Sequence, residues 1–385
     1  MPKSANCRGR VVPVGRIALF AGLLFAPLRC MSPAWSQPPA SPSRPIEQSA
    51  ISPSGKDEPQ INETKGDGTT TAGAATDEDV TRAVASGLRV LTRGAREYPE
   101  HRQCFACHHQ TLPLLALTAA QRLDLPRQTE LEQELLTFVR ESFAKRTDEL
   151  HAGEGVGGKA LTVGYALWTL RLSGEPADDL TDAMVAYLLK TQSVEGAWEL
   201  HSIRPPAEES VVFETVLAAA GIRHYARGVR QATGEAAVER TRGWLARQTT
   251  RLHEDRVARA WSVSLLGGTP AEAAGARQSL LQTQNRDGSW SQTAELGGDA
   301  YATATALYAL LDSGLSPGDE VIRRGTGFLR RTQQPDGSWH VATRATPVQV
   351  FFDNGDPWGK DQFISMMATG WATAVLARTA GSPAR

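Results

Sequence analysis

The chain has 385 residues, of which 41% are hydrophobic and 22% are charged, and its formal net charge at pH 7 is −1. This balance gives no indication of nucleic acid or an anionic membrane surface as a partner, because both attract an excess of Lys and Arg. The length is sufficient for one large domain with a sizeable core.

Residues 1–36 have the features of an export signal. Arg8, Arg10 and Arg16 give a positive start, residues 17–28 form a short apolar core, and residues 34–36 offer small side chains for cleavage. We therefore expect an exported protein, in the periplasm or at the cell surface. It would contact a membrane only through an uncleaved signal.

Residues 37–78 are rich in Pro, Ser, Thr, Gly and charge, with few large apolar side chains. Such a composition does not bury enough apolar surface to offset the entropy of ordering. We expect a disordered linker that tethers the following domain, residues 79–385.

From residue 79 the apolar side chains recur every three to four positions, which predicts helices. Charged amphipathic helices are expected at 79–97, 128–145, 178–191, 235–249, 271–284 and 319–333. They alternate with helices rich in Ala, Thr, Gly and Leu, expected at 110–124, 159–173, 209–226, 255–267, 299–313 and 362–378.

One polar and one apolar helix in each repeat of about fifty residues predicts stacked helical pairs. The Ala-rich helices belong inside and the charged helices outside. Six pairs can close into an (α/α)6 toroid, and the lack of polar capping repeats favours closure over an open solenoid.

A short phrase, Gln-x-x-Asp-Gly-Ser-Trp, occurs twice between these helices. It begins at Gln284 and Gln333 and ends at Trp290 and Trp339, and a looser copy runs from Gln192 to Trp198. We expect the Gln amide to donate to the last carbonyls of an outer helix, Asp-Gly to make the turn, and Trp to clamp the loop. These roles are structural, tying each outer helix to the next inner one.

The run from Arg324 to Trp339 resembles the QW motif of the squalene–hopene cyclase and protein prenyltransferase superfamily over its full length. Residues 275–290 and 187–198 are similar in part, and residues 242–248 match only the first half. The resemblance extends over roughly residues 80–380. It implies an α/α toroid around an apolar cavity that, in the family, holds polyisoprenoid substrates.

The chain departs from the family's known chemistries. It lacks Asp-x-Asp-Asp, whose central acid protonates an alkene or epoxide in the cyclases, and Asp178-Asp179 is the nearest pair. It has room for one toroid where the cyclases have two. The zinc ligands of the prenyltransferases and the thioester sequence of complement-type toroids are not matched either.

The segment Cys104-Phe-Ala-Cys107-His108 stands between the first outer and inner helices, where later repeats carry the Trp phrase. Cys-x-x-Cys-His is the attachment signature of c-type haem, with His108 as an iron ligand. The alternatives are a disulfide or free thiols, or another metal held with His109 and His101. A second haem ligand would come from candidates such as Met184, Met366 or Met367.

Several ionisable side chains fall at the start of the inner helices. Aligning these helices places Asp299, Glu254, Glu209, Lys159 and His109 at one end, so a polar ring is expected at one mouth of the barrel. The interpretations are helix capping and a polar gate or acid site beside an apolar pocket.

Glu214 lies within an apolar run, so we also expect that it points inward and acts as an acid, or that it sits on a solvated stripe or pairs with Arg223. The catalytic candidates are thus Glu214, Asp299 and Glu209. The segment 351–359 is expected to be a packed loop, with a ligand platform as the alternative.

Three functions remain open at this point. The first is a toroid that binds or processes a terpenoid or other lipid ligand, with catalysis uncertain. The second is a redox protein with one c-type haem on Cys104 and Cys107. The third is a carbohydrate-active toroid that uses Glu209 and Asp299 as paired acids.

Overall fold

The structure, a computed structural model, describes residues 77–347 and 351–381. The expected export signal and nearly all of the expected linker lie outside these residues. The described part forms thirteen α-helices and two isolated β-bridges. None of these helices has the length and hydropathy that a membrane crossing requires.

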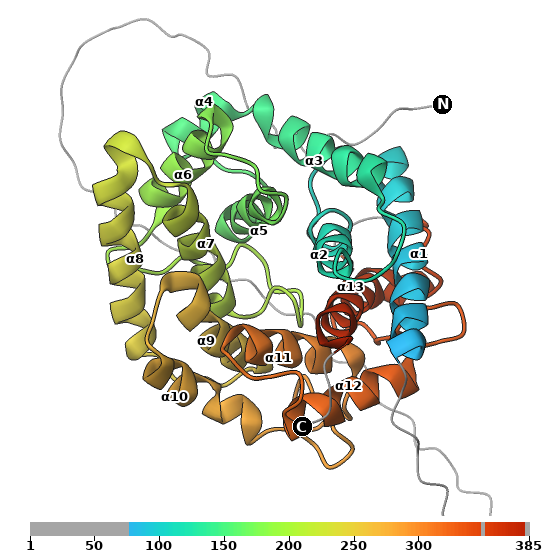
Figure 1. Cartoon of the computed structure of the whole chain (residues 1–385). Coiled ribbons are helices and arrows are strands. Elements are labelled where there is room, and N and C mark those ends of the chain that lie inside the picture. Colours follow the sequence, from blue (N-terminus) through green and yellow to red (C-terminus); the bar gives the residue numbers. More distant parts are fainter. Residues whose placement is uncertain (1–76, 348–350, 382–385) are drawn as a thin grey trace, which may run out of the picture. The chain divides into compact units, whose positions relative to one another are not determined.

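Six outer helices surround six inner helices (Figure 1). The outer set is α1 (Asp77–His101), α3 (Thr129–Ala144), α6 (Asp179–Thr191), α8 (Gln231–Ala246), α10 (Pro270–Leu281) and α12 (Glu320–Thr332). The inner set is α2 (Thr111–Ala120), α5 (Lys159–Leu172), α7 (Val211–Tyr225), α9 (His253–Leu266), α11 (Ala300–Asp312) and α13 (Gln362–Thr379).

Each inner helix packs on the next, and the last inner helix, α13, packs on both α1 and α2. The ring is therefore closed, and the expected all-α toroid of six outer/inner pairs is confirmed. The short helix α4 (Thr147–Ala152) and the 3-10 turns η1 (Gly228–Arg230) and η2 (Gly359–Asp361) were not expected. We call the face on which the inner helices begin the mouth.

The burial of the two helix types explains their places. In the inner helix α11, every residue from Ala300 to Leu310 is buried, because its small side chains let neighbours cover all sides. In the outer helix α12, only Ile322, Gly325, Phe328 and Leu329 are buried, at the three-to-four spacing of a single apolar stripe.

Candidate functional site

The Trp-ended loops hold the toroid together in a way that corrects part of the sequence prediction. Trp339, rather than Gln333, serves the end of its own outer helix: its indole Nε1 donates to the Leu329 carbonyl at 2.8 Å. Gln333 instead donates to Gly337 in its own loop, at 3.0 Å, and to Ala83 on the next outer helix, at 2.9 Å.

The two earlier copies repeat this arrangement. Gln192 donates to Ala237 of α8 at 3.0 Å, and Gln284 donates to Val321 of α12 at 2.9 Å. The backbone N–H of each Trp donates to a Thr hydroxyl on the following inner helix: Trp198 to Thr215, Trp290 to Thr303 and Trp339 to Thr369. Each loop thus joins two outer helices and one inner helix, which supports a structural role.

Two of the three repeats that lack the phrase show which other residues take its place. After α8, Arg259 of the inner helix donates to the Leu245 carbonyl, where other repeats use the indole. After α1, the Tyr98 hydroxyl donates to the Cys104 carbonyl at 3.1 Å, and the Tyr98 ring stacks on His109 with centroids 4.5 Å apart. Tyr98 therefore fastens the Cys-x-x-Cys-His loop.

Cys104 and Cys107 are free, half-buried thiols, so the disulfide alternative is not formed. Burial raises the pKa of the Cys107 thiol to about 12 and lowers the pKa of His108 to about 3. The Nδ1 atoms of His108 and His109 are in contact, and the His108 ring lies 5.0 Å from that of Phe363.

The alternative of another metal at this segment is not assembled. No three His, Cys, Asp or Glu side chains in the described ranges are placed to hold a metal ion. His101 is turned toward Glu97, 3.4 Å away, and His109 is fully buried between Tyr98 and His108. Of the candidate second haem ligands, Met366 packs against Gly94 of α1, and Met184 and Met367 are buried in the core.

A bridge of polar side chains crosses the mouth. Arg344, in the connection between α12 and α13, pairs with Glu209 before α7 and donates to Gln292 before α11 at 2.7 Å. Beside it, the connection between α6 and α7 carries the ion pair of Arg204 and Glu208. In Figure 1 this yellow-green connection projects over the middle of the ring.

The structure brings three of the five predicted ring residues together at the starts of the neighbouring inner helices α7, α9 and α11: Glu209, Glu254 and Asp299, of which Glu209 and Asp299 act on the charge of Glu254. Asp299 caps α11 by accepting from the Ala302 N–H at 2.9 Å, and burial raises its pKa to about 6. Lys159 is exposed at the start of α5, and His109 packs against α1 instead of joining the ring.

Of the three carboxyl groups at the mouth, Glu254 has neither an ion pair nor a hydrogen bond to another described residue. It is 3% exposed, and neither of its oxygens has a hydrogen-bond partner on another described residue. Burial, supplemented by Glu209 and Asp299, raises its pKa well above the ordinary value. The sequence placed Glu254 in the ring but did not single it out.

Glu214 points inward, as one interpretation expected, but its visible role is structural. Its Oε1 accepts from the Leu161 N–H in the first turn of α5 at 3.1 Å, and its Oε2 has no partner in the described residues. Burial raises its pKa to about 8. The suggested pairing with Arg223 is wrong, because Arg223 donates to the Leu265 carbonyl at 3.2 Å.

Deeper between the inner helices, four aromatic side chains meet. Trp168 of α5 stacks on Trp371 of α13 with centroids 5.5 Å apart, and Trp261 of α9 lies 4.9 Å from Trp168. Tyr308 of α11 is 5.0 Å from Trp371 and 5.6 Å from Trp261. These four side chains, which we call the aromatic cluster, bring α5, α9, α11 and α13 into contact between the inner helices.

Two clefts defined by the described residues lie elsewhere. One, of about 340 Å³, is lined by residues of α7 and α8 such as Ile222 and Val238, and the other, of about 450 Å³, includes Arg140 and Leu180. Neither is the central apolar cavity that the resemblance implies: the first lies at the ends of α7 and α9 away from the mouth, and the second lies among α3, α4 and the start of α6.

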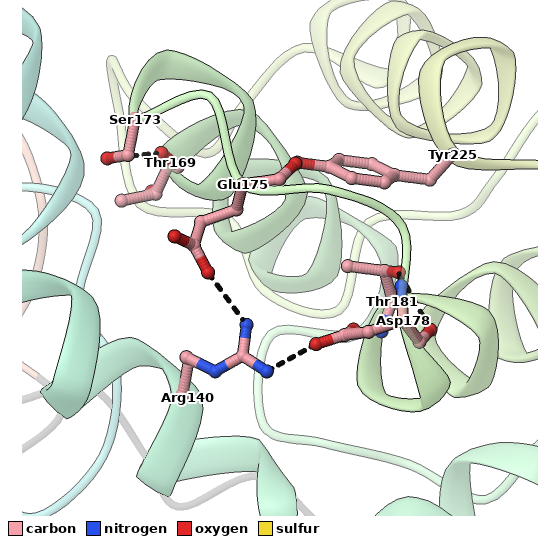
Figure 2. Close-up of polar contacts among 7 residues, drawn as sticks. All are labelled: Arg140, Thr169, Ser173, Glu175, Asp178, Thr181 and Tyr225. Carbon is pink, nitrogen blue, oxygen red and sulfur yellow. Dashed lines mark hydrogen bonds and ion pairs between the residues drawn. The ribbon is translucent and has the colours of Figure 1, made fainter.

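Asp178, the nearest match to the missing cyclase acid, is a helix cap. Figure 2 shows Arg140 of α3 reaching both Glu175, at 3.0 Å, and Asp178. Asp178 also accepts from the Thr181 N–H at 2.9 Å. Burial acts to raise the pKa of Asp178, but the hydrogen bonds from Thr181 and Arg140 outweigh it and lower the pKa.

The segment 351–359 is a packed loop, as its simpler interpretation expected. Asn354 and Asp356 are buried, the Trp358 indole donates to the Ser338 hydroxyl at 2.9 Å, and Arg102 lies over the Phe352 ring. The loop therefore covers the junction of α1 and α13 rather than presenting a flat aromatic platform.

Comparison with known proteins identifies the fold. The type II terpene cyclase MstE from Scytonema superposes with a TM-score of 0.52 at 14% identity, over 80% of this chain and 99% of that enzyme. A variant of MstE in complex with merosterolic acid A, its product, gives 0.53 at 14% identity, over 79% and 98%. A variant with the substrate geranylgeranyl dihydroxybenzoate gives 0.52 at 15%, over the same shares.

The fold is therefore that of a terpene-cyclase-like helical toroid. No family model matches the sequence. No curated protein matches it either. At these identities the likeness defines the class of fold, and the activity has to be argued from the residues of this chain.

Proposed function

We propose that this toroid binds an apolar ligand of the terpenoid or prenyl type between the mouth and the aromatic cluster. The observation that carries the proposal is the aromatic cluster on α5, α9, α11 and α13, beneath a mouth that holds the unpartnered Glu254. Sites for apolar ligands combine apolar and aromatic walls with a few placed polar groups.

The structural neighbours support this class of ligand. MstE variants are found with a geranylgeranyl-bearing substrate and with merosterolic acid A. The present chain lacks Asp-x-Asp-Asp, and the proposal is limited to binding for that reason. The carbohydrate alternative is less favoured, because Glu209 is paired with Arg344 and Asp299 caps a helix.

The test uses energy transfer from Trp to a fluorescent polyene carrying a prenyl chain. Binding beside the cluster gives transfer in the wild type that falls strongly in Trp371→Phe. In Trp244→Phe, whose indole lies on the outer helix α8, transfer is unchanged. Equal loss in both variants, or no transfer at all, would contradict the proposal. Extraction of the purified protein, followed by mass spectrometry, identifies any resident lipid.

A c-type haem on Cys104 and Cys107 is the second candidate, favoured by the donor set. The thiols are unpaired, and the Nδ1 of His108 is engaged by His109 while its Nε2 makes no hydrogen bond to a described residue. If haem were attached, Cys104 and Cys107 would hold it covalently and His108 would offer its Nε2 to the iron. A bound haem supplies one-electron chemistry.

The haem candidate is tested by one spectrum. Protein made in a cytochrome-maturing host retains a Soret band after denaturation if haem is covalently attached, and its mass rises by one haem. Two thiols that alkylate fully in the unfolded protein, with no such band, would contradict attachment.

A further inference from the structure

Three buried side chains that carry polar groups, from three inner helices, lie on the mouth side of the aromatic cluster. Glu254 of α9 has no partner for either carboxyl oxygen. Tyr165 of α5 and Tyr301 of α11 are each 2% exposed, and neither hydroxyl makes a hydrogen bond to any residue that the structure describes. All three lie in the first two turns of their helices, α9 packs directly on α11, and α7 lies between α5 and α9. Burial, with a contribution from Glu254, raises the pKa of both tyrosines well above the ordinary value.

Buried polar groups in folded proteins are almost always hydrogen-bonded, because leaving them unpaired costs free energy. Buried groups near the mouth and on α2 and α5 follow that rule: Ser210 donates to Asp255 at 2.7 Å, and Thr111 contacts Thr169 at 2.8 Å. Single unpaired atoms occur elsewhere in the described residues, such as the Thr373 hydroxyl. Glu254 departs from that rule most strongly, because among the described residues it is the carboxyl whose two oxygens are both buried and unpaired, whereas Glu214 leaves one oxygen unpaired. Its position between the mouth and the aromatic cluster, with two tyrosines nearby, indicates that a ligand supplies the missing partners.

The charge of the surroundings selects the kind of ligand. Glu208, Glu209 and Asp299 stand nearby, and Arg204 and Arg344 are already paired with Glu208 and Glu209. An anionic group such as a diphosphate would therefore meet several carboxyl groups, with these two Arg side chains already engaged. An uncharged oxygen can accept from the tyrosines and from a protonated carboxyl.

We propose that Glu254, Tyr165 and Tyr301 form a head-group site for an uncharged alcohol or carbonyl at the end of an apolar chain. This inference rests on the proposed function above, and it names the substrate class: a neutral prenyl alcohol or aldehyde, in preference to a hydrocarbon or a diphosphate. The chain of the ligand lies toward Trp168 and Trp371, and its oxygen lies at Glu254.

The experiment compares four probes of equal chain length on the full-length protein: geranylgeraniol, its aldehyde, the parent hydrocarbon and the diphosphate. In the wild type, the alcohol or the aldehyde binds at least about tenfold more tightly than the hydrocarbon and the diphosphate. Glu254→Leu removes this preference, so that the alcohol and the aldehyde bind no more tightly than the hydrocarbon, whereas Glu254→Gln, which keeps a neutral donor and acceptor, preserves it. Glu214→Gln is the control at a buried carboxyl that caps a helix, and it preserves the preference.

Thermal unfolding of the same variants separates a binding role from a structural one. A carboxyl without partners destabilises the unliganded fold, so Glu254→Leu melts at or above the wild-type temperature. A clearly lower melting temperature would assign Glu254 to the fold and overturn the proposal.

The binding outcomes separate the two proposals. Equal affinity for alcohol, aldehyde and hydrocarbon, or tightest binding of the diphosphate, would overturn the head-group site while the apolar-ligand function stands. Failure of all four probes to bind would overturn both.

Discussion

The side-chain amide of Gln333 donates to the carbonyl oxygen of Ala83 at 2.9 Å, joining residues 250 positions apart. Gln333 ends α12, and Ala83 lies in the second turn of α1. The same contact made by Gln192 and Gln284 between consecutive outer helices here joins the last outer helix to the first. The same Gln-to-carbonyl hydrogen bond that links consecutive outer helices therefore also closes the ring.

Gly337 tests this closure. Its φ of +96° and a Cβ that would lie 2.5 Å from the Ser86 carbonyl both oppose any side chain. Gly314 has a matching φ of +99° but nothing within 4 Å. We expect Gly314→Ala to lower the free energy of unfolding by about 1–2 kcal/mol, and Gly337→Ala to lower it by more than about 3 kcal/mol. Urea unfolding measures both, and equal losses would refute the proposed close contact.

Thr369 and Thr373 form a second matched pair, one turn apart on α13 and both fully buried. The Thr369 hydroxyl accepts from the Trp339 N–H at 3.1 Å, whereas the Thr373 hydroxyl has no partner in the described residues. Thr369→Val therefore leaves a buried N–H unpaired and costs about 1–3 kcal/mol, while Thr373→Val is neutral or stabilising. Urea unfolding of both variants measures the two losses. A larger loss for Thr373→Val than for Thr369→Val would contradict the hydrogen bond assigned to Thr369.

Glu214 gives a pH-dependent prediction. Burial raises its folded pKa to about 8 from an ordinary 4.5. Below pH 4.5 it is protonated in both states and its contribution is fully present. Above pH 4.5 the carboxyl ionises in the unfolded chain but stays protonated in the folded protein. The free energy of unfolding therefore falls as the pH rises from 4.5 through 8, by at most about 5 kcal/mol.

Glu214→Gln keeps an acceptor for the Leu161 N–H and removes this titration. Its stability relative to the wild type therefore increases between pH 5 and pH 8, as measured by unfolding at both values. A difference that is the same at the two pH values would show that Glu214 ionises freely in the folded state.

Cys107 gives a prediction about reactivity. With a pKa of about 12, few of its thiols are ionised at pH 8, and the thiolate is the reactive form. In a variant with Cys7, Cys30 and Cys104 replaced by serine and made without haem, we expect iodoacetamide to modify Cys107 at least about a hundredfold more slowly in the folded protein than in urea. Comparable rates in the two states would mean that the thiol is exposed.

Local patterns were enough to predict the architecture. The apolar spacing and the alternation of Ala-rich with charged segments predicted all twelve helices of the ring, because a helix buried on every side and a helix with one wet face need different compositions. The Gln and Trp phrase predicted where outer helices end. The predicted acceptor of the Gln amide was wrong: Gln192 and Gln284 donate to the next outer helix, about forty residues further on, and not to the end of their own helix.

The candidate site was only partly accessible from the sequence. Aligning the inner helices placed Glu209, Glu254 and Asp299 at one mouth, since side chains at equivalent positions of parallel helices meet. The sequence did not indicate that Arg344 would neutralise Glu209 from 135 residues away, or that Tyr98 would hold the Cys-x-x-Cys-His loop.

The amino-acid sequence by itself determined the helices, their inner or outer place and the closed repeat, because these depend on periodicity and composition within a few turns. Only the tertiary structure decided which ionisable groups are compensated: Asp178 and Asp299 as helix caps, Glu209 in an ion pair, and Glu254 without a partner. Hydrogen bonding and burial depend on neighbours brought together from distant repeats, and the charge state of a carboxyl follows from those neighbours.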